Sequence, residues 1–461
     1  MDFNVTGKHV VVAGGGRSGL AAAELLRARG ARVTLNDTQE STGLDAVRAS
    51  GVTVEVGPHR PALFAHADLV VVSPGVPPDQ EAMTAARSAG VPVIGEVELA
   101  SRWLKGRVIA ITGTKGKSTT TTLTARMLQE AGFDAPAGGN LGAALSGQVA
   151  NSRSDTVHVV EVSSFQLETT DTFHPWVSVL LNLSADHLDR HGTFESYASA
   201  KARIFANQTA SDWAVINADD PAAMALAGGY RARRLDFAID TSLSEGITLE
   251  AGSIVRRQAG ESAPLVPLSS VRLPGKHLLG DVLAATAVGC VAGVPPAAMQ
   301  RAVEGFIGLP HALERVAVID GVTFINDSKA TNVASAKRAL ESFPNGIVAI
   351  MGGRYKGGEF GDLAGVVRDR VAAIVAIGEA APLIEAALAD VTTVTRASSM
   401  DEAVAMAFVL APRPGVVVLA PACSSFDMFK DYADRGERFR DAVRALSSEQ
   451  RAEGKGQRFE R

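Results

Sequence analysis

Cysteine, excess positive charge and long apolar runs are all scarce in this sequence of 461 residues. The only two cysteines, Cys290 and Cys423, lie in apolar surroundings and form no CxxC pair, which argues against a disulfide framework and a zinc site. We therefore expect a reducing, cytoplasmic location. The net charge of −5 and the pI near 6.0 give no electrostatic footprint for nucleic acid or an anionic membrane. We expect a monomer whose partners are small molecules.

We expect no targeting signal at the start of this sequence. Residues 1–5 contain no Lys or Arg, and the apolar run 10–13 is far too short to be a signal peptide or a membrane span. We therefore expect no membrane insertion. A hydrophobic content of 46% with 21% charged residues is typical of a soluble globular protein, and 461 residues are too many for one core. The sequence predicts two or three domains.

The first segment opens like a Rossmann fold. An apolar strand precedes Gly14, Gly16 and Gly19, a helix follows, and the next strand ends at Asp37. This pattern leaves two ligands open, a redox dinucleotide such as NAD or another nucleotide, and Asp37 could equally be a carboxylate bonded within its own loop. A further strand ends in the turn that begins at Ser73, where such folds also hold ligands.

The stretch 108–119 predicts a phosphate site. A buried strand runs into a loop with Gly113 and Gly116, and a helical run follows over 119–131. Glycine lets the backbone aim its N–H groups at anionic oxygens, and the helix N-terminus adds partial positive charge. Lys117 would reach the β- and γ-phosphates, and Ser118 or Thr119 would give a hydroxyl to Mg²⁺. The spacing is the short GxxGKS, because Ile111 stands where the general P-loop has its first glycine.

Three further side chains in the middle segment are candidates. Glu161 ends a predicted strand beside the P-loop strand and is the metal candidate, although it could instead cap the Ser163 and Ser164 hydroxyls. His187 lies in a polar cluster suited to metal, base or substrate contacts, but imidazole is not a typical Mg²⁺ ligand. Lys201 falls on a predicted helix over 194–207, where sequence chemistry alone would place it on the solvated face.

The last segment begins after a predicted hinge at Gly308–His311 and has three polar loops. They follow predicted strands and cover 327–332, 352–358 and 421–432. In a parallel sheet these loops would share the carboxyl edge and could bind a dicarboxylate through lysine charge and hydrogen bonds. The alternative is that they are unrelated surface loops.

The motifs together resemble those of the Mur ligases, in particular the members that add D-glutamate. They cover nearly the whole chain in order: Thr112–Thr119, Glu161–Glu168, Asp186–Arg190, Ala200–Arg203, Asn217–Asp220, Asn326–Asn332 and Ser425–Lys430. The resemblance implies an α/β fold of three domains: a Rossmann-like UDP-substrate domain (1–96), a central P-loop ATPase-type domain with a parallel sheet (97–306) and a Rossmann-like amino-acid domain (307–461). It also implies an ATP-dependent ligase that joins D-glutamate to UDP-N-acetylmuramoyl-L-alanine through an acyl phosphate, in cytoplasmic peptidoglycan synthesis.

The resemblance also assigns site residues. Lys117, Glu161, His187 and Lys201 would be catalytic, with two Mg²⁺ ions held by Ser118, Thr119, Glu161, His187 and Lys201, the last as a carbamate. ATP would contact Thr112, Gly113, Thr114, Lys115, Gly116, Lys117, Ser118, Thr119, Asp281, His311 and Asp327. The UDP substrate would contact Ser18, Asp37, Thr38, Ser73, Asn140, Ser163, Gln166 and His187. Glutamate would contact Lys329, Thr331, Lys356, Ser425 and Phe426.

Two departures from the family pattern fall on nucleotide contacts. Leu278 and Asp281 stand where the family has asparagines, and Ala312 replaces an arginine. The catalytic positions are all present, so we expect an active ligase. Two alternatives stay open at this point: the same ligation with L-glutamate or another amino acid, and a nucleotide-binding oxidoreductase that would rest on Gly14–Gly19 alone.

Overall fold

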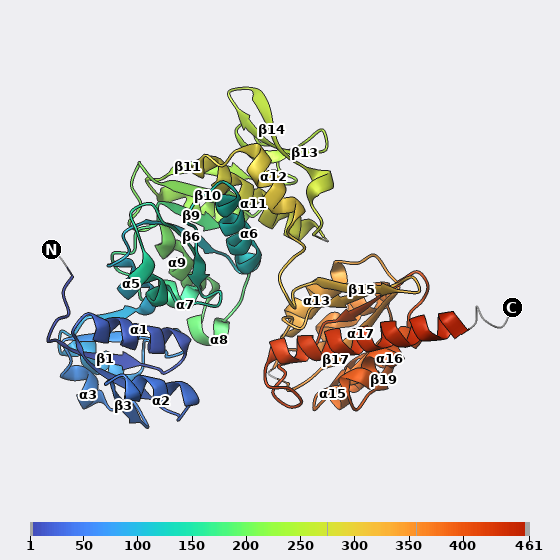
Figure 1. Cartoon of the computed structure of the whole chain (residues 1–461), viewed down its shortest axis with the longest axis horizontal. Helices are drawn as coiled ribbons and strands as arrows, with labels where there is room; N and C mark the ends of the chain where they lie inside the picture. Colours follow the sequence, from blue (N-terminus) through green and yellow to red (C-terminus); the bar gives the residue numbers. More distant parts are fainter. Residues whose placement is uncertain (1–2, 274, 356, 457–461) are drawn as a thin grey trace. The chain divides into compact units, whose positions relative to one another are not determined.

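Three separate sheets follow one another along the chain (Figure 1). The computed structural model describes residues 3–273, 275–355 and 357–456. Residues 1–272 and 277–306 form one compact unit with two of the sheets, and 273–276 with 307–461 form a second unit. The predicted α/β fold with three parallel-sheet domains is confirmed.

The first sheet is fully parallel, with strand order β3-β2-β1-β4-β5. Val10, Val11 and Val12 are completely buried, as expected for a strand covered by helices on both faces. The elements are β1 (His9–Ala13), α1 (Arg17–Ala28), β2 (Arg32–Asp37), α2 (Thr42–Ala49), β3 (Thr53–Val56), α3 (Pro61–Ala65), β4 (Leu69–Val72), α4 (Glu81–Ser88) and β5 (Val93–Gly95). Helix α5 (Glu96–Ser101) leads to the second sheet.

The second sheet has the order β14-β13-β12-β11-β10-β9-β6-β8-β7. Its strands β7 to β12 are parallel where they pair, and β12, β13 and β14 pair antiparallel. The strands are β6 (Arg107–Thr112), β7 (Ala137–Gly139), β8 (Val157–Glu161), β9 (Val177–Leu180), β10 (Trp213–Asn217), β11 (Arg233–Phe237), β12 (Gly246–Glu250), β13 (Ser253–Gln258) and β14 (Glu261–Pro267). Strand β6 therefore lies between β8 and β9, with their carboxyl ends at one edge.

The helices of this part are α6 (Lys117–Glu130), α7 (Ser164–Leu167), α8 (Leu188–His191), α9 (Phe194–Ala202), α10 (Pro221–Leu226), α11 (Lys276–Ala292) and α12 (Pro296–Glu304). The predicted helix over 194–207 is too long, since α9 gives way to a 3₁₀ turn over Arg203–Phe205. Long-range bonds hold that end: Arg203 Nε donates to Leu167 O at 2.9 Å, and Asn207 Nδ2 donates to Phe173 O at 3.0 Å.

The third sheet belongs to the second unit and has the order β15-β16-β20-β17-β18-β19. Strands β16, β20 and β17 are adjacent and parallel, while β15 pairs antiparallel at the edge. The elements are β15 (Glu314–Ile319), β16 (Val322–Asn326), α13 (Val333–Glu341), β17 (Ile347–Gly352), α14 (Ala364–Arg370), β18 (Val371–Ile377), α15 (Ala381–Leu388), β19 (Thr393–Arg396), α16 (Met400–Leu410), β20 (Gly415–Leu419) and α17 (Tyr432–Gly456).

Candidate active site

The P-loop connects β6 to α6 and depends on two glycines. Gly113 and Gly116 have φ angles of +153° and +83°, which side chains with a Cβ rarely adopt. A Cβ on Gly116 would lie 2.0 Å from Asp281 Oδ1 on α11, so the loop packs directly against that carboxyl group. The predicted strand, glycine loop and helix are confirmed, and α6 begins at Lys117.

The Lys117 side chain folds back over the backbone of its own loop. Lys117 Nζ donates to Gly113 O at 3.0 Å and to Thr114 O at 3.1 Å. Lys115 forms an ion pair with Asp186 at 3.6 Å, and Thr114 shares a 2.9 Å hydrogen bond with the Tyr197 hydroxyl. The loop is thus held in one shape, with positive charge at the helix N-terminus where phosphate oxygens bind favourably.

Glu161 lies beside the P-loop helix because β8 is parallel to β6 and adjacent to it. Its Oε2 accepts a 2.7 Å hydrogen bond from Ser118 Oγ, and its Oε1 accepts one of 2.7 Å from Asn140 Nδ2. The alternative, that Glu161 caps the Ser163 and Ser164 hydroxyls, is wrong for Ser163. The Ser163 hydroxyl donates to Gln166 Oε1 and accepts from Gln166 N, which completes a capping box for α7.

A cavity with mixed polar and apolar walls includes Lys117 and Asn140 of this region in its lining. It measures about 770 Å³, a size that suits a small-molecule ligand. The central part of the unit provides Lys117, Asn140, Ser163, Phe165, His187 and Arg190, and the loop after β4 provides Pro74, Gly75, Pro77 and Asp79. Four residues assigned by the sequence therefore share one cavity with a loop of the first sheet.

Phe165 and Arg190 are site residues that the sequence analysis missed. The Phe165 ring contacts His187 at a centroid distance of 4.8 Å and His191 at 5.3 Å, and the Arg190 guanidinium lies 4.1 Å from its centre. Arg190 also donates to Pro74 O at 2.7 Å and to Glu168 Oε2 at 3.1 Å. Both lie inside the family motifs, but a stacking contact between the short helices α7 and α8 has no sequence signal of its own.

Lys201 is buried, so its expected place on a solvated helix face is wrong. Its side chain is 2% exposed, and Nζ donates to Gly113 O at 2.9 Å and to Thr112 Oγ1 at 3.3 Å. Burial lowers the pKa of Lys201 well below its usual range, and the nearby charge of Lys117 acts in the same direction. Both effects favour the neutral form of the amine.

Asp281 is another buried ionisable group at the P-loop. Burial raises the pKa of its carboxyl well above the usual range, and the nearby polar Thr120 and the charge of Lys117 oppose this rise only partly. The carboxylic acid form is therefore favoured. A protonated carboxyl group resembles an asparagine amide in shape and in having both a donor and an acceptor.

The first-sheet residues assigned to the UDP substrate gather at the carboxyl edge of that sheet. Asp37 accepts hydrogen bonds from the Gly15 and Gln39 backbone N–H groups, so it is also a satisfied loop carboxylate. Ser73 Oγ donates to Gly14 O at 2.9 Å, which joins the two ligand loops. Ser18 is half-buried on α1, and Thr38 is exposed after β2.

The three loops assigned to glutamate follow the adjacent parallel strands β16, β17 and β20. They lie at one edge of the third sheet, as the sequence predicted. Lys329 and Phe426 are exposed, Thr331 is half-buried, and Ser425 is buried. Lys356 lies outside the described residues.

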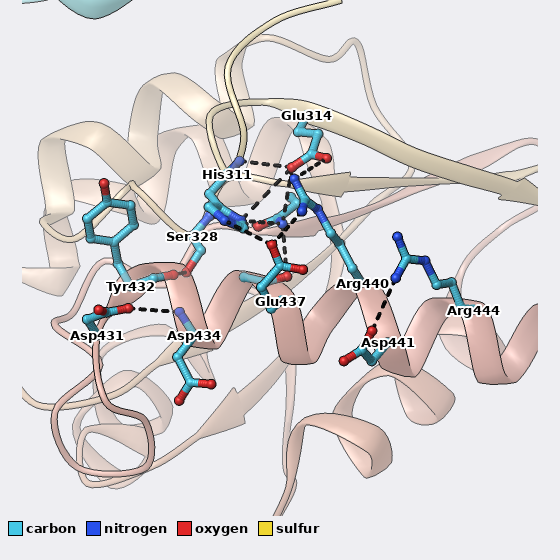
Figure 2. A network of polar contacts seen from close by, with 12 residues as sticks. His311, Glu314, Ser328, Asp431, Tyr432, Asp434, Glu437, Arg440, Asp441 and Arg444 are labelled. Atoms are coloured by element: carbon cyan, nitrogen blue, oxygen red, sulfur yellow. Dashed lines mark hydrogen bonds and ion pairs between the residues drawn. The ribbon is translucent and has the colours of Figure 1, made fainter. Parts of the chain in front are cut away.

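His311 and Asp327 lie in the second unit, close to the start of β15. Figure 2 shows His311, Glu314, Glu437 and Arg440 converging over α17. Asn326 Nδ2 donates to His311 Nδ1 at 3.0 Å, and His311 N donates to Glu314 Oε2 at 2.9 Å. Burial raises the pKa of Asp327 to about 7, and its Oδ1 accepts from Leu313 N at 3.2 Å.

The donor set fits Mg²⁺ in part. Ser118 and Glu161 provide hydroxyl and carboxylate oxygens side by side, which are ligands that Mg²⁺ accepts. Among residues 3–273, 275–355 and 357–456, no group of three or more His, Cys, Asp or Glu forms a ready metal cluster. Mg²⁺ usually keeps several waters and takes substrate phosphate oxygens as ligands.

Comparisons with known proteins match this architecture. The MurD-like N-terminal domain of Mur ligases matches residues 8–95, the Mur ligase middle domain matches 111–289, and the Mur ligase glutamate ligase domain matches 313–423. The chain belongs to the Mur ligase family. Within that family, its curated relatives include many that carry the name UDP-N-acetylmuramoylalanine–D-glutamate ligase.

Two of these relatives come from Acidobacterium capsulatum and Geotalea uraniireducens. Each is 45% identical to this chain, over 96% of the chain and 97% of the first relative, and over 95% of the chain and 98% of the second. A solved UDP-N-acetylmuramate–alanine ligase from Thermotoga maritima shares the fold, with a TM-score of 0.62 at 19% identity over 95% of this chain and 100% of that one. In the described part of this chain, no helix is long and apolar enough to cross a membrane.

Proposed function

We propose that this Mur ligase adds D-glutamate to UDP-N-acetylmuramoyl-L-alanine, with ATP cleaved to ADP and phosphate, in the cytoplasmic synthesis of peptidoglycan precursors. The observation that carries the proposal is the cavity shared by Lys117, Asn140, Ser163 and His187 with the loop after β4. The cavity lies between the phosphate loop and the carboxyl edge of the Rossmann-like first sheet. This arrangement suits a nucleotide-linked substrate whose reacting end meets ATP. The oxidoreductase alternative, which rested on Gly14–Gly19 alone, has no support from the family.

The domain roles follow from this proposal. Residues 1–96 hold the UDP part through Ser18, Asp37, Thr38 and Ser73, and residues 97–306 hold ATP through the P-loop. The muramoyl-alanine end meets Asn140, Ser163, Gln166 and His187. Residues 307–461 hold D-glutamate through Lys329, Thr331, Lys356, Ser425 and Phe426, with Asp281, His311 and Asp327 on the nucleotide side.

Chemistry at the cluster begins with activation of a carboxylate, which is a poor electrophile. Its oxygen attacks the γ-phosphorus of ATP, the bond to ADP breaks, and an acyl phosphate forms on the substrate. The glutamate amine then attacks the acyl carbon, loses a proton, and phosphate leaves with the former carboxylate oxygen. Lys117 neutralises charge on the transferred phosphoryl oxygens, and the cavity positions the carboxylate next to them.

Mg²⁺ supplies further charge neutralisation when it is bound with ATP. Ser118, Thr119 and Glu161 are its proposed ligands at the first site, and His187 and Lys201 lie at the second. Lys201 fits a carbamate because its buried amine is favoured in the neutral, nucleophilic form that reacts with CO₂. A carbamate oxygen is the hard ligand that an ammonium group cannot provide.

The experiment that tests this function is phosphate release from ATP and Mg²⁺ in the presence of UDP-N-acetylmuramoyl-L-alanine. D-glutamate, L-glutamate and no amino acid are compared. We expect release that depends on D-glutamate. Release that is equal without an amino acid, or that occurs only with L-glutamate, would contradict the proposed amino-acid specificity.

The oligomeric state is tested separately. We propose a monomer, for which light scattering coupled to gel filtration gives the mass of one 47.9 kDa chain. A mass near twice that value would contradict it.

A further inference from the structure

Arg435 on α17 is the largest fully buried side chain among those the structure describes. A guanidinium group is rarely found in the interior, because burying it without partners is costly. It donates hydrogen bonds to five oxygens, four of which are backbone carbonyls. Such an arrangement fixes backbone segments relative to one another.

The bonded oxygens belong to three different loops. Nε donates to Ser328 Oγ and Nη2 donates to Ser328 O, both at 2.9 Å, in the loop after β16. Nη1 donates to Cys423 O at 3.1 Å and to Ser424 O at 3.3 Å, in the loop after β20. Nη1 also lies 3.4 Å from Gly352 O, at the end of β17. These are the three loops assigned to glutamate.

The backbone closes tightly around the guanidinium. A Cβ on Gly353 would lie 2.1 Å from Ser424 O and 3.2 Å from Arg435 Nη1, so a larger residue would push the loops apart. Ser328 Oγ extends this hydrogen-bond network by donating to Tyr432 O at 2.7 Å. Arg354 N donates to Ser424 O at 2.9 Å and joins two of the loops directly.

We propose that Arg435 is the positioning residue of the amino-acid site: it bonds the carbonyl oxygens of three loops and thereby aims the neighbouring Lys329 and Ser425 at one bound dicarboxylate. Lys329 directly follows Ser328, and Ser425 directly follows Ser424. A shift of either carbonyl therefore moves a proposed ligand contact. This inference rests on the proposed function and deepens it.

The charge of Arg435 supports the same role. Burial lowers the pKa of Arg435 to about 10, so the side chain stays positive at neutral pH. A fixed positive charge in contact with the three loops favours the binding of an anionic ligand close to them. Lysine cannot replace this geometry, because it has one nitrogen instead of a planar fork of five N–H donors.

The test measures the KM values of Arg435→Lys for D-glutamate, ATP and UDP-N-acetylmuramoyl-L-alanine. We expect the KM for D-glutamate to rise about 10–100-fold, as the loss of two or three hydrogen bonds implies. The other two KM values should stay within about threefold. Ser328→Ala removes one acceptor and should raise the KM for D-glutamate less, about 3–10-fold.

Arg438→Lys is the matched control, because Arg438 lies on the same helix with its side chain largely exposed. It should leave all three KM values unchanged. A purely structural role would lower the melting temperature and kcat of Arg435→Lys without moving the KM for D-glutamate, and that result would overturn the inference. Should Arg435→Lys fail to fold, an unchanged KM in Ser328→Ala would overturn it. A wild-type enzyme that ignores D-glutamate would instead overturn the proposed function and this inference together.

Discussion

Ser118 Oγ donates a 2.7 Å hydrogen bond to Glu161 Oε2 and thereby joins residues 43 positions apart at the N-terminus of α6. The contact exists because β6 and β8 are adjacent and parallel, so the residues after both strands meet at one sheet edge. It places a hydroxyl and a carboxylate oxygen beside the phosphate loop.

Lys117→Ala should reduce turnover by roughly 10²–10³, because an amine that neutralises charge on the transferred phosphoryl group contributes mainly in the transition state. The amine is already held over the loop by Gly113 O and Thr114 O. Initial rates of phosphate release measure the effect, with Lys105→Ala as a control on an exposed lysine before β6. Equal rates in wild type and Lys117→Ala would contradict the role.

Glu161→Gln should raise the Mg²⁺ concentration needed for half-maximal activity by about 10-fold or more, since an amide keeps the shape of the side chain but loses the charge that attracts the ion. A Mg²⁺ titration at saturating ATP measures it. Glu195→Gln, at an exposed position on α9, serves as the control. An unchanged titration curve in Glu161→Gln would exclude Glu161 as a ligand.

Arg190→Met should raise the KM for the UDP substrate about 10-fold and leave the KM for ATP nearly unchanged. Arg190 holds Pro74 O in the cavity wall and packs on Phe165, which in turn contacts His187. Arg190→Lys should recover part of the loss because it keeps a cation over the ring. Arg231→Met, at an exposed position, serves as the control. Equal KM values for the UDP substrate in Arg190→Met and Arg231→Met would contradict the role of Arg190.

Asp281→Asn should stabilise the protein more at high pH than at low pH. Burial raises the pKa of Asp281, so the folded protein keeps the proton to a higher pH than the unfolded chain does. Wild-type stability therefore falls as the pH rises from the ordinary aspartate pKa to the raised one, whereas asparagine has no proton to lose. Melting temperatures at pH 5 and pH 8 measure the difference.

Asp390→Asn, at an exposed site, should show no such pH dependence. If the gain in melting temperature from Asp281→Asn were the same at both pH values, the carboxyl group would not be neutral in the folded protein.

Much of this site could be predicted from the sequence because its chemistry follows strand ends. Glycine spacing predicted the loop before Lys117, and an acidic residue at the end of a neighbouring strand predicted the position of Glu161. The burial of Lys201 could not be predicted, because a buried lysine on a helix has the same sequence pattern as a solvent-exposed one. The stacking of Arg190 on Phe165 and the loop contacts of Arg435 were also beyond the sequence, because both depend on tertiary packing between segments far apart in the chain.

Activation of the substrate as an acyl phosphate can be tested by following oxygen from the substrate carboxylate. UDP-N-acetylmuramoyl-L-alanine labelled with ¹⁸O in the alanine carboxylate is incubated with ATP, Mg²⁺ and D-glutamate, and the released phosphate is analysed by mass spectrometry. The account predicts one ¹⁸O atom per phosphate, together with a UDP product that has gained one glutamyl residue. Unlabelled phosphate alongside that product would contradict activation as an acyl phosphate, and labelled phosphate without a glutamyl product would contradict the ligase.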